Sequence, residues 1–290
     1  MRSRIRRSRS SELAARIRRR LGRRGGAVQW VVALTLVGAL LLLGICGPII
    51  WRHPDTMTSF YLAPPGQHGF ALGTDQFGRS LLTRIVWGIR TSLAISAASI
   101  GTAFALGTAI GLVSARLRRV DLVLMRVMDI FMAFPAILLA IGIMAMIGPG
   151  VSGVVAAIAI VYTPIFARVG RSAALEEMPK EYVAAAVAAG ASTPRVLVRH
   201  VFPNVWPLLL IQLSLALSDA ILIEAALSYL GLGVLPPTAS LGQMLRNGQS
   251  LMFNAPWTAI YPGLAIAVAV FGFNLLGDAL RDRADVRMIR

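Results

Sequence analysis

The sequence predicts an all-α integral membrane protein with six transmembrane helices. Of its 290 residues, 56% are apolar and 14% are charged, and the mean hydropathy is +0.70. A soluble domain has about 45–50% apolar and about 25% charged residues. A spanning helix needs about 20 mostly apolar residues. Six stretches meet this need and leave no soluble segment long enough for a separate enzymatic domain: about 27–50, 90–115, 127–147, 151–168, 205–231 and 257–277.

A strongly basic segment precedes the first span. The chain carries 29 Lys and Arg against 13 Asp and Glu, which gives a formal net charge of +16. Residues 1–24 hold eleven arginines and one glutamate, and so supply ten of these charges. A basic arm can bind nucleic acid, but beside a spanning helix it is attracted to anionic lipid, by about 1 kcal/mol per basic residue. We interpret residues 1–26 as a cytoplasmic tail at the lipid bilayer and 27–290 as the transmembrane domain, and we expect no nucleic-acid partner.

The first span is expected to be an uncleaved helix. Its apolar run of about 20 residues exceeds the 7–15-residue core of a signal peptide, and no clear A-x-A cleavage site follows it. Loops that face the cytoplasm carry an excess of Lys and Arg. With six spans, this rule places both termini in the cytoplasm, together with the basic residues of segments 116–126, 168–199 and 281–290.

Two segments, about 51–89 and about 231–256, are then expected outside. Both are rich in Pro, Gly and polar residues, and neither has the composition of a folded domain. Within the first, residues 79–90 place four apolar side chains on one helical face. Because interfacial helices have this pattern, we expect 79–90 to lie flat on the membrane before the second span begins.

The longest inside segment, about 168–203, contains more local signals than a simple connection needs. Residues 182–189 are rich in alanine and favour a helix, and Gly190 is suited to end it. Ser192-Thr193-Pro194 can start a second helix with proline in its first turn. The segment therefore predicts a short helix, a tight turn and another short helix. Its small side chains would let another protein approach closely, while a solvated hairpin is the alternative that these residues leave open.

Two carboxylates, Asp219 and Glu224, fall in the fifth span. A charge at mid-bilayer costs at least about 2.5–3.5 kcal/mol on insertion scales, so each is expected to face protein or water. They are five residues apart, about 140° around a helix, so a paired proton relay is not expected. Glu224 either lines a translocation route or closes a structural hydrogen bond between helices. For Asp219 the structural role is favoured.

Glycines and prolines in the spans predict packing and bending. Gly107 and Gly111 form a GxxxG motif, which allows close helix contact and says nothing about substrate. Prolines interrupt three helical patterns and can kink them, although prolines are also frequent in ordinary spans. They are Pro135, Pro164 and Pro207.

No catalytic or metal site is expected. His53, His68 and Asp75 lie on one outside segment, but their spacing fits no recognised ligand pattern. The spans contain no Ser/His, Cys/His or metal cluster with catalytic spacing. The chain also lacks G-x-x-x-x-G-K-[ST], so it cannot hold ATP phosphates in a P-loop. We expect no enzyme activity and no cofactor bound by this chain.

The inside segment resembles the signature loop of ABC importer permeases. Ala184-Ala185-Ala186 is followed after three residues by Gly190, and after nine more by His200-Val201-Phe202-Pro203. The family pattern begins Glu-Ala-Ala, and this chain has Ala184 where the Glu stands. The resemblance implies coupling helices that dock into a groove on a separate ATPase. The residues assigned to this expected coupling loop are Tyr182, Ala184, Ala185, Ala186, Gly190, Ala191, Ser192, Pro194, Arg195, His200 and Pro203.

Three further segments resemble the second, C-type permease of dipeptide, oligopeptide and nickel importers. The outside one contains Gly73-Thr74-Asp75-Gln76-Phe77-Gly78-Arg79 with His68 before it, although Ser80 stands where the family has an acidic residue. Its matching positions are His68, Gly73, Thr74, Asp75, Gly78 and Arg79. The others are 224–233 with Pro236-Pro237, and 277–282. The resemblance covers about residues 27–287 in family order.

This resemblance implies a type I ABC importer permease fold in a bacterial cytoplasmic membrane. It implies a homologous second permease subunit, two ATP-binding subunits that hold ATP and Mg, and an extracytoplasmic substrate-binding protein that delivers a peptide. Nickel or another small cargo of the same family is the alternative substrate. A secondary transporter that uses Asp219 and Glu224 is a rival of another class, but we find no inverted repeat to support it.

Overall fold

The computed structural model describes residues 28–288, and side chains as far as Arg283. The predicted tail, residues 1–26, lies outside the described residues. The described part is built almost entirely of helices, and five of them are long and apolar enough to cross a membrane. They are Val28–Ile50, α2 (Leu81–Arg116), α5 (Val151–Glu177), the run Thr193–Tyr229 that ends with α8 (Phe202–Tyr229), and α10 (Trp257–Met288).

The remaining predicted span, about 127–147 and third along the chain, is part of a bent pair of helices. α3 (Arg118–Met132) and α4 (Ala136–Ile147) meet at an angle of 95°. Pro135 lies at the break, where it has no N–H to donate and disfavours a helical conformation at Phe134. The Pro135 carbonyl then accepts the first hydrogen bond of α4, from Leu139 N at 3.0 Å. The span predicted over 127–147 is therefore broken within its length, and the proposed kink at Pro135 is confirmed. Pro164 and Pro207 lie inside α5 and α8, which continue through them as helices.

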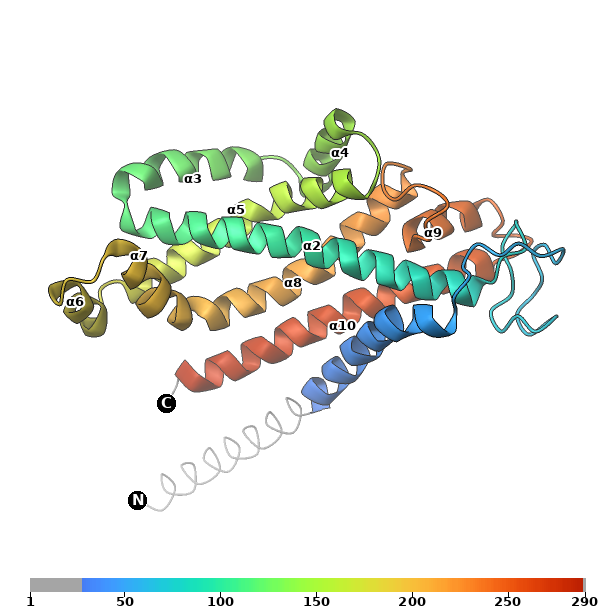
Figure 1. Cartoon of the computed structure of the whole chain (residues 1–290), viewed down its shortest axis with the longest axis horizontal. Coiled ribbons are helices and arrows are strands. Elements are labelled where there is room, and N and C mark those ends of the chain that lie inside the picture. The colour runs from blue at the N-terminus through green and yellow to red at the C-terminus, as the bar shows by residue number, and fades with distance from the viewer. Residues whose placement is uncertain (1–27, 289–290) are drawn as a thin grey trace, which may run out of the picture.

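The long helices run side by side between two ends of the molecule (Figure 1). We call one the α6 end, because it carries α6 (Glu181–Ala188) and α7 (Thr193–Arg195). The other, the α9 end, carries the 51–80 loop and α9 (Leu241–Gln249), a helix that the sequence analysis did not predict. The Arg283 guanidinium lies 4.0 Å from the Trp30 ring centroid, so the N-terminal helix starts beside the end of α10.

Residues 79–90 do not form a flat interfacial helix. Leu81 begins a continuous 36-residue helix, α2, and the Ser80 hydroxyl caps its first turn by accepting from Thr83 N. Leu81, Ile85 and Ile89 are buried in a core cluster with residues of α8, α9 and α10. The apolar face that suggested membrane contact therefore packs against protein, and this prediction was wrong.

Two boundaries on the α6 side also differ from prediction. α5 continues to Glu177, about two turns past the expected end near 168. The second short helix is not separate, because α7 passes through a π-helical segment, η1 (Val196–Val201), directly into α8. Pro203 has no N–H for an α-helical bond to the Arg199 carbonyl, and the Phe202 N–H bonds to Leu197 in the wider i to i+5 pattern.

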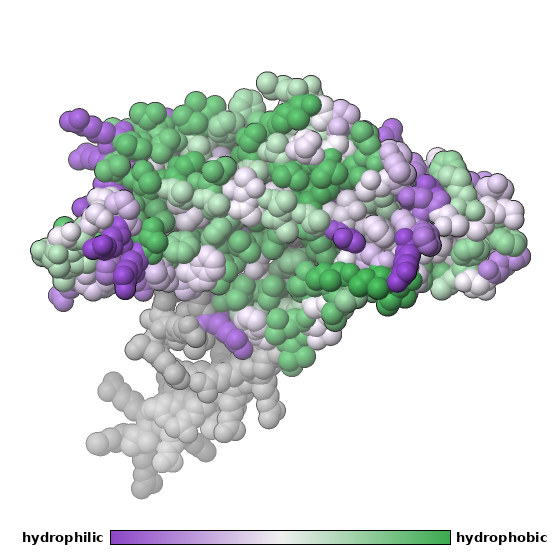
Figure 2. All heavy atoms as spheres, in the orientation of Figure 1, coloured by the Kyte–Doolittle hydropathy of each residue, from purple (hydrophilic) through white to green (hydrophobic). Residues whose placement is uncertain are grey.

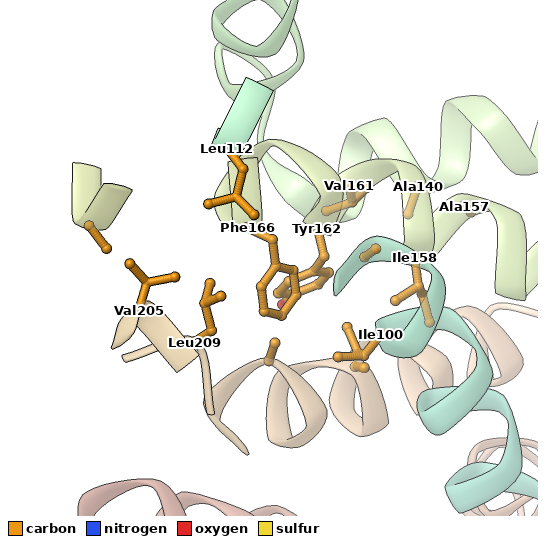
Figure 3. Close-up of a cluster of buried hydrophobic side chains, with 14 of the residues drawn as sticks. Ile100, Leu112, Ala140, Ala157, Ile158, Val161, Tyr162, Phe166, Val205 and Leu209 are labelled. Carbon is orange, nitrogen blue, oxygen red and sulfur yellow. The ribbon is translucent and has the colours of Figure 1, made fainter. Parts of the chain in front are cut away.

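Close packing of α2 against α5 forms the centre of the bundle. A Cβ atom at Gly107 would lie 2.4 Å from the Thr163 carbonyl oxygen, and one at Gly111 would lie 2.4 Å from that of Ala167. The predicted packing role of this GxxxG motif is confirmed. Figure 3 shows Phe166 and Tyr162 of α5 in the adjoining core, with neighbours from α2 and α8.

The surface separates into bands that suit a bilayer. Figure 2 shows hydrophobic residues across the middle of the molecule, with hydrophilic residues gathered toward the two ends. Many large apolar side chains of the helices are exposed, including Leu122, Ile130 and Leu138 on the bent pair. This distribution is what a protein surrounded by lipid and by other apolar helices requires.

Candidate functional site

We call α6, the turn at Gly190 and α7 the α6 hairpin. It projects at one end of the bundle, between the ends of α5 and α8 (Figure 1). Gly190 follows α6 with a φ of +82°, a conformation that glycine adopts without a Cβ penalty. The Gly190 N–H bonds to the Val187 carbonyl at 2.9 Å, and the Ala191 N–H bonds to the Ala186 carbonyl at 3.0 Å. These two bonds are those of a Schellman motif, so the predicted helix stop at Gly190 is confirmed.

The hairpin presents small side chains to its surroundings. α6, all of whose residues the structure describes, buries a single side chain, Val183. Ser192 occupies the N-cap position of α7, with Pro194 in the first turn as predicted, but its side chain makes no capping bond. Among the candidate coupling residues, three are half-buried, namely Ala186, Ala191 and His200, and the others are exposed, namely Tyr182, Ala184, Ala185, Gly190, Ser192, Pro194, Arg195 and Pro203.

The hydroxyl of Tyr182 ties α6 to both neighbouring helices. It donates to a carboxylate oxygen of Glu177 at the end of α5, and it lies 3.2 Å from the His200 carbonyl oxygen. The Asn204 side-chain amide, in the first turn of α8, donates to the Tyr182 hydroxyl at 3.0 Å and to the His200 carbonyl at 2.7 Å. Glu177 also accepts from Lys180 Nζ at 2.6 Å. Burial and the neighbouring carboxylate raise the pKa of Tyr182 to about 12.

Glu224 is fully buried and bonded to three serine hydroxyls. It accepts from Ser92 of α2 at 2.6 Å, from Ser228 one turn further along α8 at 2.9 Å, and from Ser240 at 3.4 Å. Ser240 is also the N-cap of α9. Of the two roles that the sequence left open for Glu224, this geometry fits the structural hydrogen bond between helices. The sequence carries no local signal for the bond to Ser92, which is 132 residues away.

Asp219 has a different environment. Its side chain is exposed in this single chain, and it lies beside the Tyr162 hydroxyl of α5. Asp219 and Glu224 therefore do not share a site, as their spacing around the helix predicts. Two other carboxylates connect α3 to α5: Asp129 pairs with Arg168 at 2.5 Å, and Asp121 pairs with Arg171 through two hydrogen bonds.

The residues of the motif that was predicted to lie outside shape the 51–80 loop. The Thr74 hydroxyl donates to the Phe60 carbonyl at 2.6 Å and accepts from Ala63 N at 2.8 Å. Asp75 accepts from Arg79 through its backbone N–H at 2.9 Å and its Nε at 2.7 Å. His68 stacks on Phe60 with 4.1 Å between ring centroids. These bonds hold the loop in one shape.

The two glycines of this motif are required by close backbone contacts. Gly73 has a φ of +80°, and a Cβ there would lie 2.4 Å from the Ala63 carbonyl oxygen. Gly78 has a φ of +72°, and a Cβ there would lie 2.2 Å from the Thr58 carbonyl oxygen. Both the backbone conformation and the space exclude a larger residue. In the part of the chain that the structure describes, no group of three or more His, Cys, Asp or Glu residues is arranged to hold a metal.

An ion-pair network connects this loop to α2. Arg84, in the first turn of α2, is 3% exposed, and its guanidinium contacts Asp55 at 2.5 Å. Arg79 lies 4.0 Å from the same carboxylate. The sequence motif includes Arg79 but not Asp55 or Arg84. The pairing of Asp55 with Arg84 could not be predicted from local pattern, because these residues are 29 positions apart.

Comparison with known proteins identifies the family of this chain. Residues 107–290 match the family described as "Binding-protein-dependent transport system inner membrane component". The chain is 42% identical over 260 residues to the di/tripeptide transport system permease protein DppC of Pseudomonas aeruginosa, covering 86% of each chain. It is 38% identical over 262 residues to the dipeptide transport system permease protein DppC of Alkalihalophilus pseudofirmus, covering 89% of this chain and 86% of that protein.

A solved structure shows the same fold at lower identity. An inward-facing MetNI methionine ABC transporter matches with a TM-score of 0.59 and 20% identity, over 70% of this chain and 97% of that one. The fold and the family match define a multi-pass membrane subunit of a transport system. The chain belongs to the binding-protein-dependent transport system inner membrane component family, and it is a permease subunit of an ABC importer.

Proposed function

We propose that this chain forms half of the translocation pathway of an ATP-driven importer for dipeptides or short oligopeptides. The observation that carries the proposal is the projecting α6 hairpin, which is held between two helices that cross the bundle. A partner that moves this hairpin would displace α5 and α8 together, provided that the hairpin is held firmly to both. The peptide class is supported by the relatives, whose names specify dipeptide and di/tripeptide transport.

The α6 end is proposed to face the cytoplasm, with the N-terminal tail and the end of α10. Basic residues near this end, among them Arg116, Arg195 and Arg199, agree with the excess of positive charge on cytoplasmic loops. The exposed residues of the hairpin would then meet an ATP-binding subunit. The α9 end and the 51–80 loop would meet an extracytoplasmic substrate-binding protein.

Energy is proposed to come from separate subunits. The sequence has no P-loop motif, so ATP and Mg would be held by two ATP-binding partners and no cofactor by this chain. Closure of these partners on ATP would favour one arrangement of the helices and release would favour the other, a population shift driven by differential binding. A homologous second permease would complete the pathway.

Purification from the native membrane in mild detergent, followed by mass spectrometry, tests this assignment. We expect a second six-span permease, P-loop ATPases and a binding protein that carries a peptide. A binding protein that carries nickel or another small cargo would replace the peptide class. Recovery of the chain alone, with transport in proteoliposomes that needs no ATP, would contradict the proposal and support the secondary transporter.

A further inference from the structure

The α6 helix has little packing of its own to fix its orientation. It has eight residues, too few to be stable as an isolated helix in water. It buries Val183, while most of its other side chains are exposed. A partner that pushed on such an element could rotate it locally and leave the long helices where they are. Some other contact must make α6 move with the bundle.

The Tyr182 hydroxyl supplies that contact. A phenol has one hydrogen to donate and lone pairs to accept. Because a carboxylate is a stronger acceptor than a neutral carbonyl, the hydrogen goes to Glu177, and the phenol oxygen accepts from Asn204 at 3.0 Å. One atom of α6 is thus bonded at the same time to the end of α5 and to the first turn of α8.

The other bonds of this cluster do not depend on the hydroxyl. Without it, Glu177 keeps its ion pair with Lys180, and Asn204 keeps its bond to the His200 carbonyl. Each helix therefore retains its own hydrogen bonds, and what is lost is the connection among α6, α5 and α8. The Lys180 amine cannot replace it, since it is 54% exposed and lies on the short α5–α6 connection.

We propose that Tyr182 is a positioning residue that makes α6 move as one unit with α5 and α8. The proposal rests on the proposed function, in which α6 receives movement from an ATP-binding subunit. It separates two properties of the hairpin. The small exposed residues bind the partner, and the Tyr182 hydroxyl transmits the partner's movement to the spans.

Tyr182→Phe in the complete complex, reconstituted in proteoliposomes with a dipeptide and the binding protein, tests this role. The ring and the exposed surface are kept, so the ATPase should co-purify at the wild-type ratio and the melting temperature of the complex should stay near that of wild type. Transport per ATP hydrolysed should fall about 2–13-fold, the range set by loss of one hydrogen bond of about 0.5–1.5 kcal/mol. Asn204→Ala should lower the same ratio.

Two control variants separate this role from a general loss of hydrogen bonds. Tyr229→Phe removes a hydroxyl that donates to Gln249 near the α9 end, and Lys180→Met removes the exposed ion pair with Glu177. Tyr229→Phe should keep the wild-type ratio of transport to hydrolysis, and Lys180→Met should lower it less than Tyr182→Phe does. A wild-type ratio in Tyr182→Phe, or loss of the ATPase from that variant, would overturn the positioning role. Absence of any ATPase from the wild-type complex would overturn the proposed function itself, and this inference with it.

Discussion

Glu224 is a buried carboxylate whose partners are hydroxyl groups from three separate segments. Its bonds to Ser92, Ser228 and Ser240 join α2, α8 and the start of α9. Gly242 of α9 supports this junction, because a Cβ there would lie 2.1 Å from the Ala225 carbonyl oxygen of α8. A buried polar group is tolerated when it is hydrogen-bonded. Glu224 therefore holds α9 against the spans.

Replacement of this carboxylate should lower stability. Glu224→Ala leaves three buried hydroxyls without their acceptor and creates a cavity, which together should cost about 2–5 kcal/mol of the free energy of unfolding. We expect a clear fall in the melting temperature of the purified complex. Glu176→Ala, which replaces an exposed glutamate of α5, should change it little. Equal melting temperatures of the two variants would contradict the structural role of Glu224.

Gly190 tests the hairpin surface at the residue scale. Its φ of +82° strains most side chains, and a Cβ there would meet nothing of this chain within 4 Å. Gly190→Trp should therefore leave membrane insertion intact but abolish co-purification of the ATPase, because the turn would no longer fit a partner's groove. Gly190→Asn, a residue that tolerates this conformation, should keep much of the association. Normal ATPase binding by Gly190→Trp would refute this account of the hairpin.

At the scale of elements, α2 and α5 pack closely against each other in the centre of the bundle. Side chains at Gly107 and Gly111 would clash with backbone atoms of α5. Gly107→Leu should therefore prevent correct packing and yield little folded protein in size-exclusion chromatography after detergent extraction. Gly101→Leu, on the same helix but with no atom within 4 Å of its Cβ position, is the matched control. Similar yields of both variants would show that the close contact is not required.

The sequence predicts the number and type of elements better than their ends. Length and hydropathy are sufficient for the spans, because a bilayer sets both. The break at Pro135 was visible as a possibility, but its size depends on what packs around α3 and α4. The start of α2 was misread because an apolar helical face looks the same whether it meets lipid or protein. Only the folded structure shows that Leu81 and Ile85 meet α9 and α10.

In the candidate sites too, features that depend on neighbouring residues could be predicted, and features that depend on tertiary packing could not. Small residues and Gly190 could be identified from local pattern, since caps and turns depend on neighbouring residues. The Tyr182–Glu177–Asn204 cluster and the serines around Glu224 could not, because they form between segments that are distant in the chain or separated by turns. The motif over 73–79 could be recognised in the sequence, but the roles of its residues could not. The hydrogen bonds of Thr74 and Asp75 show that these two residues shape the loop.

At the scale of the whole molecule, the two ends have different tasks in this account. The α6 end carries the hairpin, and the α9 end carries the 51–80 loop with its ion pair between buried Arg84 and Asp55. Helices that cross the whole bundle connect them. An event at one end can reach the other because α5 and α8 are continuous, with π-helical turns only near the α6 hairpin.

The most direct test of this account is to ask which end of the chain meets the ATPase. Cys46, the single cysteine, would first be replaced by serine, and one new cysteine introduced at exposed Ala185 in α6 or at fully exposed Phe253 near the α9 end. Crosslinking in native membranes should join Ala185→Cys to a P-loop ATPase, and Phe253→Cys should give no such adduct. An ATPase adduct from the α9 end, or none from α6, would contradict the central claim that this permease is coupled to ATP hydrolysis through the α6 hairpin.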